Sequence, residues 1–290
     1  MTNTASELDT RARTGDAGGR GWLLALVGLL LVAVYGPTVK WLWGRWTLSV
    51  WHNAHGLFIP LVVAYFAWSE LKGLRHLPRA SSAWGFVFLV PALMLHALDA
   101  GINTQLLSAI SIVFAVPGLS LLFLGAERTK AIAFPLAFLA FMLPIPLAVT
   151  AKLHLALRHV ATWATAHLLP LLGIPVYSES TTLHLANGTL QVADACSGFS
   201  TLYASVAVAF LCAYACRSWK QRLLVLVASV PIAIAANIVR VVLLAVLVRT
   251  QGFEILETWI HPATGMLTFA LALPAILWLG TPREQKAGRA

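Results

Sequence analysis

The sequence predicts an all-α polytopic membrane protein with about eight transmembrane helices, an outer amphipathic helix and a short outer β-hairpin. Two properties predict this fold class. The 290 residues are 59% hydrophobic and only 11% charged, with a mean hydropathy of +0.80, whereas a soluble domain carries roughly 25% charged residues. The apolar residues also gather in separate runs, each close to the roughly 20 residues that cross a bilayer core. This composition excludes a soluble domain.

Eight apolar runs are candidate spans. The first could imitate a signal peptide, but it is long enough to cross the membrane and further spans follow it, so we expect an uncleaved helix. The internal prolines are compatible with membrane helices, in which neighbouring groups satisfy the freed backbone atoms. The expected spans cover residues 21–39, 54–71, 83–100, 104–125, 131–149, 198–216, 223–248 and 263–280.

The basic residues predict the orientation. With the N-terminus inside, fourteen of the 20 Lys and Arg residues fall in tails and loops on the cytoplasmic side, as the positive-inside rule describes. We therefore expect both termini in the cytoplasm, with a disordered tail over residues 1–20, an integral-membrane domain over 21–280 and a second tail over 281–290. The net charge of +9 reflects these topology signals and does not indicate a nucleic-acid partner.

Residues 151–195 interrupt the apolar pattern between the fifth and sixth expected spans. The stretch from Ala151 to Pro170 is amphipathic, with one polar and one apolar stripe. The polar stripe contains His154, Arg158, Thr162 and Thr165, and the apolar stripe contains Leu153, Leu157, Val160, Ala164 and Leu168. A ninth span here would move the basic residues after the sixth span to the outside, so we expect a helix that lies in the outer interface.

A β-hairpin is predicted after this helix, because Asn187-Gly188 is a strong signal for a two-residue turn. A turn at this pair would place Leu183 opposite Val192 and give the hairpin one apolar and one polar face. An exposed hairpin cannot sit in lipid. We therefore expect it in the outer aqueous phase or interface, from which it leads the chain to Cys196.

Cys196 is the first candidate for chemistry. It lies in the segment VADACSGFSTL, directly before a run expected to be a helix. The positive end of a helix dipole lowers the pKa of a thiol and favours the nucleophilic thiolate. Most buried cysteines, however, are inert small hydrophobic residues, and we interpret Cys212 and Cys216 as packing residues. No CxxC or CxxxH metal spacing appears, and no metal or cofactor is expected.

Arg240 and His261 are expected on the same side of the membrane as Cys196. Arg240 lies 17 residues beyond Leu223, the expected inner start of the seventh span, which is roughly 26 Å along a helix and most of the way across a ~30 Å core. Asn237 lies one turn below it on the same face. An arginine inside the membrane indicates a functional site unless it snorkels to the headgroups. His261 opens the eighth span from the outside.

Cys196, Arg240 and His261 together supply the groups of a cysteine acyl-transfer site. The thiolate is the nucleophile, the imidazole is the acid and base, and the fixed cation stabilises a developing oxyanion. Substrate-binding or supporting roles are expected for four neighbours, namely Asp194, Ser197, Gly198 and Asn237.

These motifs resemble the exosortase/archaeosortase family. The resemblance covers about residues 20–280 and rests on DACSG, NIVR, His261 with Gly265 four residues later, the PIP of residues 144–146 and the GIPV of residues 173–176. It implies a membrane-embedded cysteine protease or transpeptidase with Cys196, Arg240 and His261 as catalytic residues. The implied substrates are exported proteins with a C-terminal sorting signal of the PEP-CTERM kind, made of a short motif, a transmembrane helix and a basic tail. Cleavage would occur at the outer face of the cell inner membrane, in contact with lipid.

Two positions depart from the commoner family pattern. Phe199-Ser200 stands where many relatives have an arginine, and Pro262 stands where many have an acidic residue. The first change removes a charge that could bind substrate, and the second removes a group that could orient His261. These differences suggest a divergent subfamily with a different signal motif.

Two other functions are compatible with parts of the sequence, namely a transporter and a metal enzyme. A transporter or carrier of lipid-linked substrates would use Arg240 to bind an anion, with Cys196 incidental, but the spans contain few further ionisable residues. A metal enzyme would combine His52 and His55 with His154 or His159, but no HExxH motif or carboxylate cluster supports it.

Overall fold

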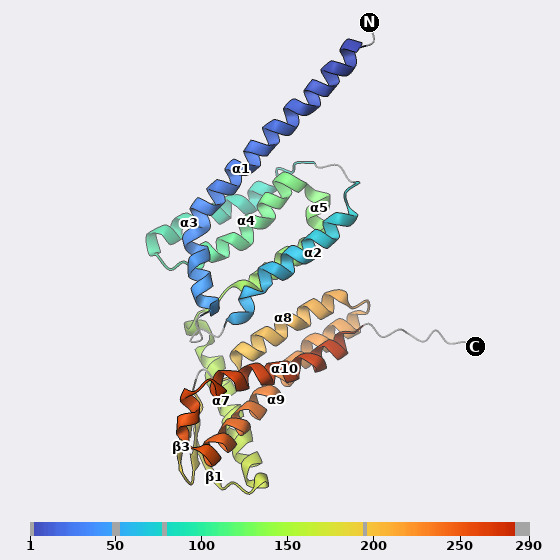
Figure 1. Ribbon diagram of the computed structural model, residues 1–290. Helices are drawn as coiled ribbons and strands as arrows, with labels where there is room; N and C mark the ends of the chain where they lie inside the picture. Colours follow the sequence, from blue (N-terminus) through green and yellow to red (C-terminus); the bar gives the residue numbers. More distant parts are fainter. Residues whose placement is uncertain (1–2, 48–52, 77–79, 194–195, 282–290) are drawn as a thin grey trace, which may run out of the picture. The chain divides into compact units, whose positions relative to one another are not determined.

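The computed structural model describes residues 3–47, 53–76, 80–193 and 196–281, with the backbone alone for residues 3–21, 23, 24 and 147. The chain divides into two compact units (Figure 1). The first comprises Met1–Leu48 with Gly56–Pro144, and the second Ser49–His55 with Ile145–Ala290. The described residues form helices and one small sheet, which confirms the predicted all-α polytopic class.

Long apolar helices and several shorter ones make up the first unit. α3 packs along α4 where Gly85 and Gly118 face each other, since a Cβ on Gly85 would lie 2.6 Å from the Gly118 carbonyl oxygen. Small residues at such interfaces let helix backbones approach closely in membranes. The elements are α1 (Asn3–Thr47), η2 (Ala54–Leu57), which leads into the unit, α2 (Ile59–Gly73), α3 (Gly85–Ile102), α4 (Leu106–Leu124), α5 (Ala126–Ala131), α6 (Ala133–Phe138) and η3 (Leu139–Met142).

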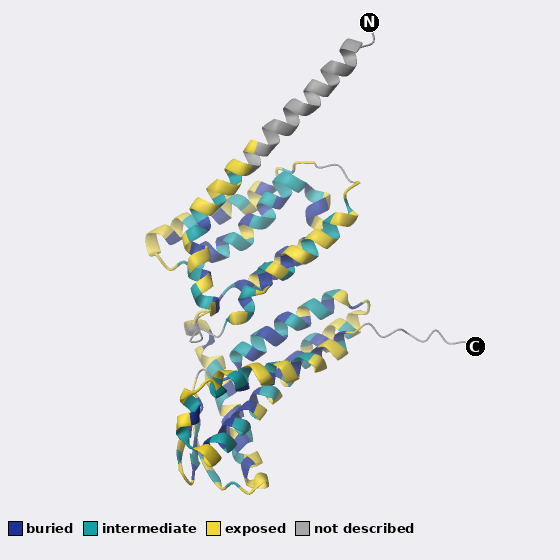
Figure 2. Cartoon of the chain, in the orientation of Figure 1, coloured by how far each residue is buried: buried dark blue, intermediate teal, exposed yellow. Residues whose placement is uncertain are grey.

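The second unit carries all the candidate site residues. Its helices α8, α9 and α10 pack against one another, and α7 packs against α9 and the sheet (Figure 1). Buried residues recur at helical spacing along α9, from Val225 to Val248, and buried positions are dark blue in Figure 2. The elements are α7 (Leu147–Leu168), η4 (Leu169–Leu172), β1 (Val176–Glu179), β2 (Thr182–Leu185), β3 (Gly188–Gln191), α8 (Phe199–Ala215), α9 (Trp219–Gln251), η6 (Phe253–Glu257) and α10 (Ile260–Gly280).

The helices agree with an integral membrane protein. Within the described residues, six helices are long and apolar enough to cross a membrane, and two shorter apolar helices, Ala133–Met142 and Phe199–Ala215, fall where the fifth and sixth spans were expected. The backbone of α1 is helical from Asn3, which differs from the disordered tail expected over residues 1–20. Most of the C-terminal tail expected over 281–290 lies outside the described residues.

The span expected over residues 131–149 is not a single helix. The short helices α5, α6 and η3 follow one another, and the last of them ends at Met142. The backbone is extended at Leu143, and α7 then begins at Leu147. Pro144 and Pro146 explain this break, because the residue before a proline is driven out of the α region and proline donates no backbone hydrogen bond. The amphipathic helix therefore starts before the expected Ala151.

The burial of α7 shows which of its two stripes faces the protein interior. Its polar stripe faces inward, with Thr162 and Thr165 fully buried and His154 and Arg158 half-buried. Much of its apolar stripe is exposed, including Leu153, Val160 and Leu168. The exposed side also carries Lys152 and His159, and α7 is not among the described helices that are long and apolar enough to cross a membrane, so its location in the outer interface stays a prediction.

The sheet contains the predicted hairpin and one strand that was not predicted, in the order β1-β2-β3. β2 and β3 pair with Leu183 opposite Leu190, so the predicted pairing of Leu183 with Val192 is wrong by two residues. The turn is Ala186-Asn187 instead of Asn187-Gly188. A shift of two residues keeps every side chain on its original face, so the predicted apolar face is present.

Contacts with the end of α9 and with η6 account for the turn. The Asn187 side chain donates from Nδ2 to the Val248 carbonyl at 2.8 Å. Gly188 lies against the Phe253 ring, where a Cβ would be 2.6 Å from the nearest ring carbon. These tertiary contacts determine the position of the turn between β2 and β3. They involve residues far away in the sequence, so the Asn187-Gly188 pair alone does not predict them.

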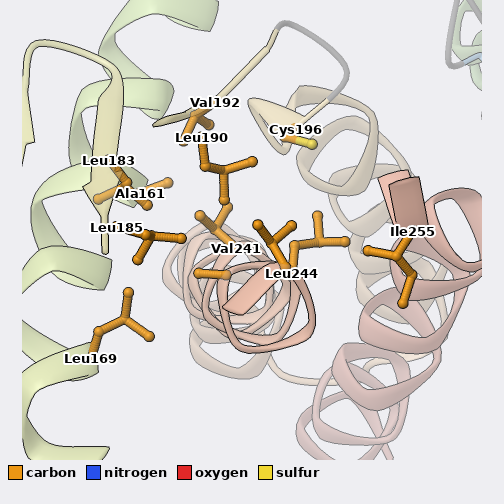
Figure 3. Close-up of a cluster of buried hydrophobic side chains, with 12 residues drawn as sticks. Ala161, Leu169, Leu183, Leu185, Leu190, Val192, Cys196, Val241, Leu244 and Ile255 are labelled. Atoms are coloured by element: carbon orange, nitrogen blue, oxygen red, sulfur yellow. The ribbon is translucent and has the colours of Figure 1, made fainter. Parts of the chain in front are cut away.

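The apolar face of the hairpin anchors it to α9 and holds the loop of Cys196 (Figure 3). Burying a leucine side chain stabilises the fold by about 1.5–3 kcal/mol, so several such contacts keep the hairpin in place. Cys196 is itself 8% exposed and belongs to this buried cluster. The cluster consists of Ala161, Leu169, Leu183, Leu185, Leu190, Val192, Cys196, Val241, Leu244, Ala245, Val248 and Ile255.

Candidate active site

Cys196 and His261 form a thiol–imidazole pair. The Sγ atom of Cys196 lies 3.1 Å from Nε2 of His261, within hydrogen-bonding distance. Cys196 precedes α8, and His261 lies in the first turn of α10. The packing of α8 against α10 brings the two residues together across the intervening chain.

Arg240 of α9 lies beside this pair. Its side chain is only 5% exposed, and its guanidinium packs against Gly265 of α10. A Cβ on Gly265 would lie 3.1 Å from the guanidinium carbon and 3.3 and 3.4 Å from the two terminal nitrogens. Gly265 is about one turn beyond His261, so the missing side chain leaves room for the cation next to the imidazole.

Burial raises the pKa of the Cys196 thiol, and the positive charge of Arg240 opposes this by lowering it. Burial is the larger effect, so the pKa lies above its ordinary value. The expectation of a pKa lowered by the dipole of α8 is therefore wrong, because the loss of water around Cys196 disfavours the thiolate. A thiol of this kind needs a base during the reaction, and Nε2 of His261 is placed to accept its proton.

We expect Arg240→Gln to slow the alkylation of Cys196. Removing the cation leaves the effect of burial unopposed, so the thiol pKa rises and the thiolate fraction at a given pH falls. The measurement is the rate of iodoacetamide modification against pH in a background carrying Cys212→Ala and Cys216→Ala. The rise in rate should move to higher pH for Arg240→Gln and stay in place for the control Lys152→Gln. Coincident curves would show that Arg240 does not act on the thiol.

Asn237 and Gly198 hold the backbone at Cys196. The buried Asn237 side chain donates from Nδ2 to the Cys196 carbonyl at 3.1 Å. Gly198 has a φ of 82°, in the left-handed region that favours glycine, and a Cβ there would lie 2.4 Å from Cγ of Asn237. α9 therefore fixes the nucleophile loop at two points. Asp194, the remaining predicted supporting residue, lies outside the described residues.

Ser197 is contacted by His154, a residue that the predicted site omitted. Nδ1 of His154 lies 2.9 Å from Oγ of Ser197, and its ring lies against Phe199 with centroids 4.6 Å apart. Oγ of Ser197 also accepts the backbone N–H of Phe199 at 3.3 Å. His154 lies on the inward stripe of α7, but no sequence pattern indicates its partner 43 residues away.

The chain matches a known protein family over most of its length. Residues 43–278 match the family model described as transmembrane exosortase, a range that includes every described residue of the site. The chain belongs to the transmembrane exosortase family. This match confirms the predicted family. Exosortases process the sorting signals of exported proteins and are generally cysteine transpeptidases. No curated protein and no solved structure matches this exosortase.

Proposed function

We propose that this exosortase cleaves C-terminal sorting signals of exported proteins with Cys196 as nucleophile, His261 as acid and base, and Arg240 as the oxyanion-stabilising cation. The observation that carries the proposal is the 3.1 Å distance between Sγ of Cys196 and Nε2 of His261. The buried guanidinium of Arg240 beside this pair completes the set of groups that acyl transfer requires.

The first half of the reaction forms a thioester. Nε2 of His261 takes the thiol proton as Sγ of Cys196 attacks the scissile carbonyl carbon, and the Arg240 guanidinium stabilises the oxyanion. His261 then gives the proton to the leaving amine as the C–N bond breaks. The released fragment contains the transmembrane helix and the basic tail, and the exported protein stays joined to Cys196.

The second half of the reaction releases the exported protein. An acceptor, either water or an amine, gives a proton to His261 and attacks the thioester carbonyl. The C–S bond breaks, and the sulfur regains a proton from His261. Water gives hydrolysis, whereas an amine gives transpeptidation.

The neighbouring residues have supporting roles in this mechanism. Asn237 holds the Cys196 carbonyl, and Gly198 allows the close approach of α9. Ser197 links the start of α8 to α7 through His154. Asp194 is included as a substrate-binding or supporting group on its position in the DACSG motif alone.

An exported reporter tests this function directly. The reporter carries at its C-terminus the sorting signal of an exported protein from the same genome and is co-expressed with the enzyme. We expect a shorter reporter whose new C-terminus, determined by mass spectrometry, lies within the short motif. A reporter with the motif scrambled is the control. An uncleaved reporter beside folded, membrane-inserted enzyme would remove the proposal.

We further propose that the site faces the exterior of the inner membrane, with both termini in the cytoplasm. Fourteen of the 20 Lys and Arg residues support this orientation. A C-terminal green fluorescent protein should fluoresce, and alkaline phosphatase inserted at Asn187 should be active. A C-terminus on the outer side would contradict the eight-span topology and the placement of Cys196 that follows from it.

A further inference from the structure

The sheet leads directly to the nucleophile and ends in an edge strand. β3 is the last strand in the order β1-β2-β3, and the chain continues from it through Val192 to Cys196. Leu190, Val192 and Cys196 share one buried cluster (Figure 3). The strand and the nucleophile are therefore held by the same packing.

The pairing of β2 with β3 determines which backbone groups face the open edge. The Val192 N–H donates to the Thr181 carbonyl at 2.9 Å, so this is a hydrogen-bonded pair. In an antiparallel ladder such pairs alternate, which turns the N–H and C=O groups of Thr189 and Gln191 away from β2. Within the described residues, no further backbone hydrogen bond engages these groups. Both residues are exposed.

The two edges of the sheet differ in how they are protected. β1 carries Glu179, which pairs with His184 at 3.6 Å, and α7 packs against this strand. β3 reads Gly-Thr-Leu-Gln and has neither a charged residue nor a proline, the two devices that commonly block strand addition. β3 is therefore the edge suited to accept another strand.

We propose that β3 binds the short extended motif of the sorting signal as a fourth strand of the sheet. The backbone groups of Thr189 and Gln191 pair with the motif, and this pairing positions the scissile carbonyl at Cys196. Strand addition uses main-chain bonds for affinity and alternate side chains for specificity. The inference rests on the proposed function and adds the surface that holds the substrate.

An ester scan of the substrate tests the proposal without altering the enzyme. The probe is a synthetic peptide containing the sorting-signal segment of an exported protein from the same genome, cut by the purified full-length enzyme. Each backbone amide is replaced in turn by an ester, which removes one N–H donor. We expect kcat/KM to fall about tenfold at every second position of the motif, since strand pairing alternates. Uniform losses, or none, would overturn the proposal.

An edge variant supplies the matched test on the enzyme. Gln191→Pro removes an outward N–H at a position where edge strands tolerate proline, and Ser178→Pro does the same on β1. We expect KM to rise about tenfold for Gln191→Pro and to stay near the parent value for Ser178→Pro. Equal alkylation of Cys196 by iodoacetamide shows that the site is intact in both. An unchanged KM for Gln191→Pro with intact alkylation overturns the proposal, as do equal effects of the two variants. If Cys196 is no longer alkylated in Gln191→Pro, the variant has disturbed the site, and the ester scan alone decides whether the substrate binds to β3.

Different results would contradict the proposed function and the strand-addition site. If Cys196→Ala still processes the peptide, the proposed function is wrong. If Cys196 is required but the ester scan shows no alternation, only the strand-addition site is wrong.

Discussion

Cys196→Ala is expected to abolish processing of the exported reporter, whereas Cys212→Ala and Cys216→Ala leave it near the parent level. Removing the nucleophile of an acyl-transfer enzyme costs on the order of 10⁶-fold in rate. The other two cysteines contact Gly280 at the far end of α10: the Cys216 thiol lies 3.4 Å from its carbonyl oxygen, and a Cβ on Gly280 would lie 2.5 Å from Cβ of Cys212. They have a packing role in that region.

The measurement is reporter cleavage by the three variants at matched levels of membrane-inserted protein. Alanine removes the thiol without adding volume, so loss of folding is not expected at any of the three positions. Equal loss in all three variants would indicate that cysteines act structurally in this chain. Cleavage by Cys196→Ala would exclude thiol chemistry at this position.

Arg240→Lys is expected to lower cleavage by about 100- to 1000-fold, which corresponds to roughly 2.7–4 kcal/mol in the barrier. Lysine keeps the positive charge but replaces the planar fork of donors by a single ammonium on a different stem. The guanidinium packs against Gly265, where a Cβ would lie 3.1 Å from its carbon, and the ammonium of a lysine does not reproduce that contact. If Arg240 only snorkelled to the headgroups, lysine would substitute freely.

Arg249→Lys is the matched control, because Arg249 lies on the same helix in its last turn and is exposed. Its cleavage rate should equal that of the parent. Near-parent cleavage by Arg240→Lys would remove the arginine from the reaction and leave a Cys–His pair. Such a result would also favour the reading of Arg240 as a lipid anchor.

The sequence predicted the parts of the fold that depend on local composition. Apolar runs near the length of a bilayer core identified the helices, and the alternation around Leu183 and Leu185 identified the buried face of the hairpin. The common location of Cys196, Arg240 and His261 followed from counting residues along the spans, and the structure brings these side chains together.

Features that depend on tertiary contacts could not be predicted in this way. The hairpin register is determined by contacts of Asn187 with α9 and of Gly188 with η6, and neither contact has a local signature. The inward turn of the polar stripe of α7 depends on partners such as Ser197 for His154. The direction of the pKa shift of Cys196 depends on how deeply the thiol is buried. The position of Cys196 in the motif does not indicate its burial.

Phe199 at the start of α8 makes contacts with other aromatic rings. Its ring lies against those of His154 and Tyr203, at centroid distances of 4.6 and 6.1 Å. A row of rings therefore lines the start of α8.

The most direct test of the central claim is a mass measurement of the enzyme during turnover with the reporter. We expect a covalent adduct on Cys196 that adds the mass of the cleaved reporter less one water, is released by hydroxylamine as a thioester should be, and is absent in Cys196→Ala. Cleavage without an adduct on Cys196, or with the adduct on another residue, would contradict the account.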